Sequence, residues 1–355
     1  MNKRNADLGF FKFLYAWIIV LFHLTAKSQI HCVGGFYGVD FFLLVAGLFF
    51  FQSYEKQCAA NRLITPGQYL KKRFLRFFPW SMTAFLFAFV AWRIVLEPVH
   101  SVGDVADAFS SDIWEILMVK WCGINEGGNL LNGPAWTLSA MCIVGFFLWS
   151  CLYYWKDKFL HLVMPLTLCL GYALWRHLES ASFDAWVGFT TFGTLRAWLV
   201  MSLGYYALQL TKKLRQIRFN RWGKLLLTAF EIGAHVFILL VMFRRNTRYY
   251  QWLCTLLFLL TTAIAVSGHS YLNTFLDKCR FTGFLGELSF SVFLIHAPLQ
   301  AMYVRWHDVS AWSRPQLDYL ALVLAAAVAH LFVTKAVLRL VPHIRACCKR
   351  SLTEK

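Results

Sequence analysis

Lys12 and His23 are ionisable residues inside the first long apolar run of the sequence. An ionisable group at mid-bilayer costs about 2.5–3.5 kcal/mol on insertion scales, so each one needs a reason. The two stand eleven positions apart, three helical turns plus about 20°, so they share one helix face with a rise of about 16 Å. A neutral imidazole suits general-base chemistry on a hydroxyl, and an ammonium group can steer an anion. A purely structural histidine is the competing interpretation, and both stay open.

Asp40 stands at the start of the second apolar run, directly after Gly38 and Val39. One interpretation makes it a helix N-cap that accepts hydrogen bonds from backbone N–H groups. The other makes it a carboxylate that orients an imidazole, such as that of His23. The sequence favours neither.

Arg73 and Arg76 stand one helical turn apart and therefore share a face. Paired guanidinium groups suit bidentate phosphate binding, which would place a phosphorylated donor beside them. The same residues also belong to a basic segment that signals membrane topology. Pro79 is predicted to open the helix that follows.

Pro134 predicts the start of another apolar helix, with Trp136 at the outer membrane interface and Ser139 one turn further on. No nucleophile-elbow context surrounds Ser139, so this serine is no evidence for a catalytic triad. Trp136 and Ser139 are therefore interpreted as acceptor-side or structural residues.

His296 is a second histidine within an apolar run, and it competes with His23 for the role of general base. Ser289 precedes it by seven positions and shares its face, and Pro298 predicts a kink just after it. Ser289 is interpreted as acceptor-side or structural. The 10 Cys show no CxxC pair and no metal-type spacing with histidine, so no metal site is predicted.

The composition predicts the elements that must position these residues. Of the 355 residues, 59% are hydrophobic and 15% are charged, whereas a soluble domain needs about a quarter charged. A helix needs about 20 apolar residues to cross the hydrocarbon core. The chain is therefore predicted to be an all-α integral membrane protein, a single domain over 1–355 with about ten transmembrane helices. The predicted spans are 8–26, 36–53, 79–96, 134–155, 159–176, 191–210, 225–243, 251–268, 281–303 and 317–341.

Positive charge is unevenly divided between the connecting segments. Segments 55–79 and 211–224 are strongly basic, whereas segment 97–133 is mostly acidic. Because basic loops stay in the cytoplasm, both termini are predicted to be cytoplasmic in a multi-pass protein of the plasma (cell inner) membrane. Lys12 then lies near the cytoplasmic edge and His23 toward the outer half.

The net charge of +17 is concentrated in these short loops, so it marks topology rather than a nucleic-acid surface, and nucleic acid is not an expected partner. One basic cluster breaks the pattern because the layout places it outside. It consists of Arg244, Arg245 and Arg248.

The sequence resembles the acyltransferase 3 family of membrane acyltransferases over nearly its whole length, in span number and in motif order. The family usually has arginine where the first span has Lys12, and many members have glutamate where this chain has Met141. The residues that match the family's motifs are Lys12 and His23; Gly38, Val39, Asp40 and Phe41; Arg73, Arg76 and Pro79; and Gly286, Ser289, Leu294 and His296.

This resemblance implies transfer of an acyl group, commonly acetyl, from cytoplasmic acyl-CoA to a hydroxyl of an extracytoplasmic glycan or glycolipid. Acyl-CoA, expected as acetyl-CoA, is a substrate here, and no bound cofactor is expected. The alternatives are a transporter or flippase with a buried Lys, His and Asp pathway, and a membrane protein without activity. The resemblance implies His23, Asp40 and His296 as catalytic residues and Lys12, Arg73 and Arg76 as donor-binding residues.

Overall fold

The computed structural model describes residues 5–24, 32–92, 101–119, 131–177, 185–244, 250–279, 281–306 and 315–353. These ranges are almost entirely helical, with one short antiparallel pair of strands. The elements are α1 (Ala6–Leu24), η2 (Gly35–Tyr37), α2 (Gly38–Ala59), α3 (Pro66–Phe89), α4 (Val102–Ile116), η4 (Gly133–Ala135), α5 (Trp136–Lys158), η5 (Phe159–Val163), α6 (Met164–His177), β1 (Trp186–Val187), β2 (Thr190–Thr191), α7 (Phe192–Gln216), α8 (Arg221–Met242), α9 (Gln251–Ser267), α10 (Tyr271–Lys278), α11 (Thr282–Trp306) and α12 (Pro315–Thr353).

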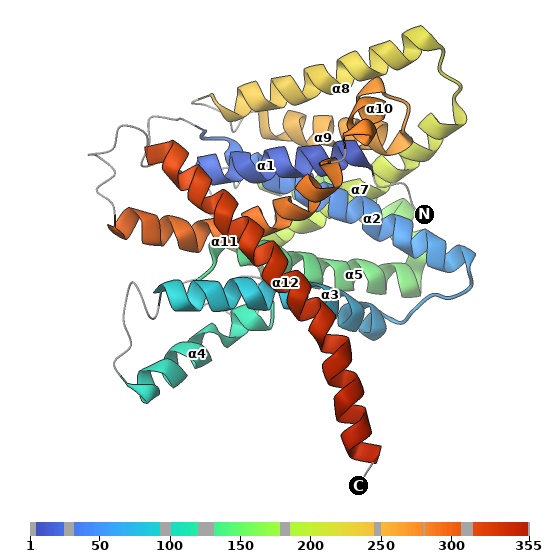
Figure 1. Ribbon diagram of the computed structural model, residues 1–355. Helices are drawn as coiled ribbons and strands as arrows, with labels where there is room; N and C mark the ends of the chain where they lie inside the picture. The colour runs from blue at the N-terminus through green and yellow to red at the C-terminus, as the bar shows by residue number, and fades with distance from the viewer. Residues whose placement is uncertain are drawn as a thin grey trace.

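In the described residues, most of each of the ten predicted spans lies on helical backbone. The ends of two of these spans, 25–26 and 93–96, lie outside the described residues. Within the described residues, 7 helices are long and apolar enough to cross a membrane, or up to 8 if the bent pair α9 and α10 forms one span. This supports a helical, multi-pass membrane protein, while the count of about ten crossings and the placement of the termini stay predictions. Figure 1 shows α12 running obliquely across the bundle and continuing past it toward the C-terminus.

Glycines let two pairs of helices approach backbone to backbone. A Cβ on Gly286 of α11 would lie 2.9 Å from the Cα of Gly9 on α1. A Cβ on Gly204 of α7 would collide with the backbone of Gly47 on α2. Small residues at helix crossings allow this close packing in membranes, where the lipid is as apolar as the side chains. The first crossing lets α1 pack closely along α11.

The structure corrects the predicted start of the third span. α3 begins at Pro66, directly after Thr65, whose hydroxyl accepts a hydrogen bond from the Gln68 N–H at 3.4 Å. Gln68 returns the bond, since its Oε1 accepts from the Thr65 N–H at 3.0 Å, which completes a capping box. Pro79 therefore lies inside α3 instead of opening a helix. Arg73 and Arg76 lie on a helix that is long and apolar enough to span the membrane, rather than in a loop.

A helix also occurs in the predicted acidic loop. α4 begins after Ser101, whose side chain forms a capping box with Asp104. Its exposed apolar residues Phe109 and Ile113 share one face, four positions apart. The span prediction missed α4 because an amphipathic helix contains no continuous apolar run.

The predicted topology can be tested at Ile217, which is 48% exposed between α7 and α8. In a cysteine-free background, Ile217→Cys is expected to resist a membrane-impermeant thiol reagent added to whole cells. Ser101→Cys, exposed at the start of α4, is expected to react and serves as the matched control. Labelling of position 217 from outside would overturn the orientation and the cytoplasmic donor site that depends on it.

Candidate active site

The two candidate histidines meet where α1 lies along α11. The ring centroids of His23 and His296 are 5.0 Å apart, with the planes tilted by 45°. His296 is fully buried, whereas His23 is only partly buried at the end of α1. The Gly9–Gly286 crossing lies toward the other end of α1 and holds the two helices close together. The structure therefore joins two residues that the sequence could only present as rivals.

Hydrogen bonds define the tautomer of His296. Its Nδ1 lies 2.8 Å from the carbonyl oxygen of Phe293 and 3.3 Å from that of Val292. Carbonyl oxygens only accept, so Nδ1 carries the proton and Nε2 keeps its lone pair. Nε2 is buried and has no hydrogen-bond partner among the described residues. A buried imidazole nitrogen that can accept a proton is what general-base chemistry requires.

The helix around His296 is opened by Pro298, which has no N–H to give to the carbonyl of Leu294. The side-chain amide of Asn132 fills this position, donating to the Leu294 oxygen at 2.7 Å. The Tyr319 hydroxyl donates to the carbonyl of His296 at 2.7 Å. Gln300 similarly donates from its side chain to the carbonyl of His23. These three side chains thus bond to the carbonyl of His23, to that of His296 and to that of Leu294, two residues before His296.

A basic cluster lies on α1 and α3, toward the predicted cytoplasmic side. It consists of Lys12 on α1 and of Arg73 and Arg76 on α3. Lys12 lies within electrostatic reach of Arg76, and its ammonium group is 5.7 Å from the ring centroid of Phe49. The Arg73 guanidinium lies 4.5 Å from the ring centroid of Phe77. The structure therefore places Lys12 with the arginines, about 16 Å of helix rise from His23.

Asp40 has a different partner from the one that the sequence suggested. Its carboxylate accepts from Arg196 Nε at 2.7 Å and from the Thr255 hydroxyl at 3.3 Å. Asp40 is the third residue of α2 and fully buried, so it is not the N-cap residue. Its hydrogen bonds go to Arg196 and Thr255 rather than to His23. Arg196 also donates to the Phe36 carbonyl at 3.1 Å. The ion pair joins α7 to the start of α2.

A family model described as an acyltransferase domain matches residues 5–336. The match covers almost the whole chain and includes each of the residues above. The chain belongs to the acyltransferase 3 family. Searches of curated proteins and of solved structures found no match.

The remaining predicted site residues are buried, and the hydroxyls of the two serines lie near backbone carbonyls three or four residues before them. Ser289 donates to the carbonyl of Gly286 at 2.9 Å, and the Ser139 hydroxyl lies 3.5 Å from the carbonyl of Ala135. Trp136 is buried at the start of α5, and η4, which precedes it, packs against α11. Their roles on the acceptor side remain predictions. Met141, which stands where many members of the family have glutamate, is 8% exposed.

Several further buried polar residues were missed at the sequence level, among them Arg196 and His330. Arg196 could have been found, because an arginine inside an apolar run demands a partner. His330 on α12 bonds to Thr83 at 2.9 Å and to Ser291 at 3.0 Å, so it ties α3, α11 and α12 together. Its satisfied nitrogens make it a structural histidine. In the described part of the chain, no three His, Cys, Asp or Glu side chains come together as a metal site.

Proposed function

We propose that this acyltransferase moves an acyl group, expected to be acetyl, from cytoplasmic acyl-CoA to a hydroxyl of an extracytoplasmic glycan or glycolipid. The supporting observation is the pairing of His23 with His296 at 5.0 Å between ring centroids, three helical turns from Lys12 along α1. The proposal assigns the chemistry to the imidazole pair and donor binding to the basic cluster, about 16 Å away along α1. An elongated donor can bridge them, with its phosphates at the basic cluster and its thioester near the imidazoles.

The chemistry assigns a proton acceptor and a leaving group. His23 takes the proton of the acceptor hydroxyl, and the oxygen attacks the thioester carbonyl. The new C–O bond forms as the C–S bond breaks, and the proton passes to the departing sulfur to give free CoA. His296, with its acceptor Nε2, lies beside His23. Two imidazolium charges so close together would repel, so the pair gains one proton rather than two during the step.

Purified protein in detergent or proteoliposomes provides the direct test. We expect it to release CoA from acetyl-CoA in the presence of a glycan or glycolipid acceptor, with the acceptor gaining one acetyl ester detectable by mass. Transport of either substrate without release of CoA would instead support the transporter alternative.

The donor site predicts a specific defect in a double variant. Arg73→Gln/Arg76→Gln is expected to raise the KM for acetyl-CoA at least tenfold, because a hydrogen bond to a charged group contributes about 1.5–3 kcal/mol. The matched control, Arg218→Gln/Arg221→Gln, removes two exposed charges of the other basic segment and should leave KM unchanged. A normal KM for acetyl-CoA in the Arg73/Arg76 variant would show that these arginines do not bind the donor and serve only as a membrane-topology signal.

A further inference from the structure

The hydroxyl of Tyr69, in the first turns of α3, has no hydrogen-bond partner among the described residues. Tyr69 is only 8% exposed, so bulk water does not satisfy this group. A buried tyrosine hydroxyl normally finds a partner, because leaving it unpaired is costly. A ligand oxygen is one group that would complete the site.

The ring of Tyr69 is held rigidly by its neighbours. It stacks on Trp149 with 4.5 Å between centroids and a 12° angle between planes, and it meets Phe50 edge to face at 5.6 Å. The Trp149 indole N–H donates to the carbonyl of Ile64 at 3.0 Å, which fixes the stacking partner. A Cβ at Gly145 would lie 2.7 Å from the Tyr69 oxygen, so the hydroxyl rests against the backbone of α5. Its position is therefore preset.

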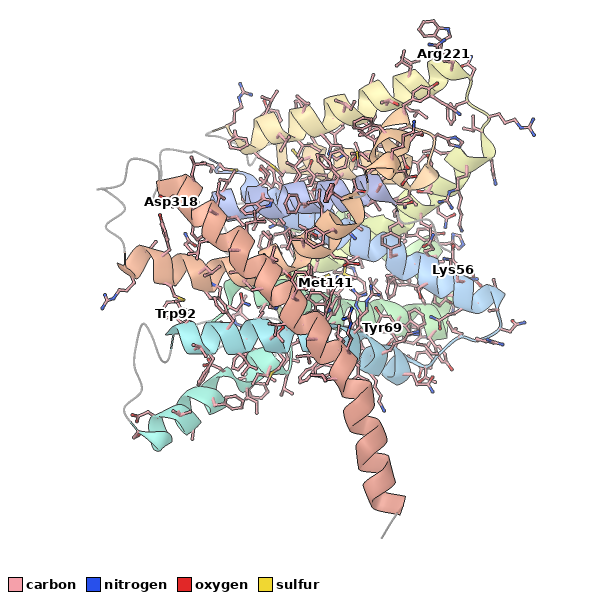
Figure 2. All side chains as sticks on the ribbon, viewed as in Figure 1. Lys56, Tyr69, Trp92, Met141, Arg221 and Asp318 are labelled. Carbon is pink, nitrogen blue, oxygen red and sulfur yellow. The ribbon has the colours of Figure 1, made fainter. Side chains whose placement is uncertain are left out.

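The hydroxyl lies beside the basic cluster. Tyr69, Arg73 and Arg76 are spaced by four and three residues on α3, so they share one face. The Nε of Arg73 is likewise buried and has no hydrogen-bond partner among the described residues. Both Tyr69 and Arg73 lie within electrostatic reach of Cys142 on α5. Figure 2 shows Tyr69 and Met141 in the interior of the bundle, in the region of α3 and α5.

The groups of α5 at this level do not satisfy the two donors. Met141 and Cys142 present sulfur atoms, which are weak acceptors, and Gly145 has no side chain. The two unsatisfied donors are the Tyr69 O–H and the Arg73 Nε–H, and both lie near the guanidinium of Arg76. Together they select an oxygen that carries negative charge.

We propose that the Tyr69 hydroxyl is a donor-binding group, which gives its hydrogen bond to an anionic oxygen of the acyl donor beside Arg73. This inference rests on the proposed function, and it adds a neutral residue to a site that otherwise consists of charges. Tyr69 binds the part of the donor that does not react, so its contribution is the same in the ground state and in the transition state.

Tyr69→Phe removes only the oxygen and is the decisive variant. We expect the KM for acetyl-CoA to rise about tenfold or more, with kcat nearly unchanged, because uniform binding is lost. The melting temperature in detergent should stay the same or increase, because the hydroxyl has no protein partner to lose. A residue with only a structural role would not produce this split between KM and kcat.

Tyr54→Phe is the matched control in the same aromatic group. Its hydroxyl donates to the carbonyl of Leu152 at 2.9 Å, and its ring meets Trp149 edge to face at 5.4 Å. Loss of this bond should lower the melting temperature and leave the KM for acetyl-CoA unchanged. Tyr69→Phe is therefore expected to raise KM without lowering the melting temperature. Tyr54→Phe is expected to lower the melting temperature without changing KM.

Gly145→Ala tests the position of the hydroxyl independently. The new methyl group would push on the Tyr69 oxygen, so KM should rise in the wild-type background and rise far less when Tyr69 is already Phe. The outcomes distinguish the two proposals. If the wild type processes acetyl-CoA and Tyr69→Phe keeps a normal KM, the assignment of Tyr69 falls alone. If the wild type neither binds nor processes acetyl-CoA, both proposals fall.

Discussion

His23→Ala is expected to lower the rate of acyl transfer by about 10²–10⁴-fold, because the loss of a general base has that effect. Folded protein should remain in the membrane, since the imidazole of His23 is partly exposed and lies at the end of α1. The measurement is the release of CoA from acetyl-CoA at matched amounts of folded protein, as judged by size-exclusion chromatography in detergent.

The variant must be assayed beside two others. His235→Ala removes a different buried imidazole, one that is bonded to Tyr15 of α1 at 2.7 Å, so it measures the general cost of losing a buried histidine. His296→Asn keeps an N–H for the Phe293 carbonyl and removes the acceptor Nε2. A nearly active His23→Ala variant together with an inactive His296→Asn variant would transfer the role of base to His296.

The sequence predicted the helices well and their ends poorly. Apolar runs of about 20 residues predict helices, because a helix satisfies its backbone hydrogen bonds within a single segment in lipid. The start of α3 was wrong because apolar counting assigns charged residues to loops. Long basic side chains can instead extend from a spanning helix toward water, as the exposed Lys71 and Lys72 do in the first turns of α3.

The contents of the site were predictable, but not how its residues pair. As histidines inside apolar runs, His23 and His296 could be recognised as candidates from the sequence. Their proximity depends on the close approach of α1 and α11 at Gly9 and Gly286, which no local sequence pattern reveals. The bond between Asp40 and Arg196 joins residues 156 positions apart. Partners at such separation follow only from the packing of α2 against α7.

Arg196→Ala is expected to destabilise the protein by about 3–5 kcal/mol, because it leaves the Asp40 carboxylate buried without its charged partner. Activity should also fall in the protein that remains folded. Arg196 binds the carbonyl of Phe36, whose ring packs against Phe22, the neighbour of His23 in α1. Loss of this support should loosen η2, whose Phe36 ring packs beside the end of α1 that bears His23.

The ion pair of Lys212 and Glu55 supplies the control for this prediction. Its atoms are as close, at 2.6 Å, but its side chains are 44% and 34% exposed. Exposed pairs contribute about 0–1 kcal/mol, so Lys212→Ala should barely change the melting temperature in detergent. The double variant Asp40→Asn/Arg196→Gln removes both charges and should be more stable than Arg196→Ala, because no uncompensated carboxylate remains. Equal melting temperatures for Arg196→Ala and Lys212→Ala would contradict a structural role for the buried Asp40–Arg196 pair. The expected effect of Arg196 on His23 through Phe36 and Phe22 would then lose its support.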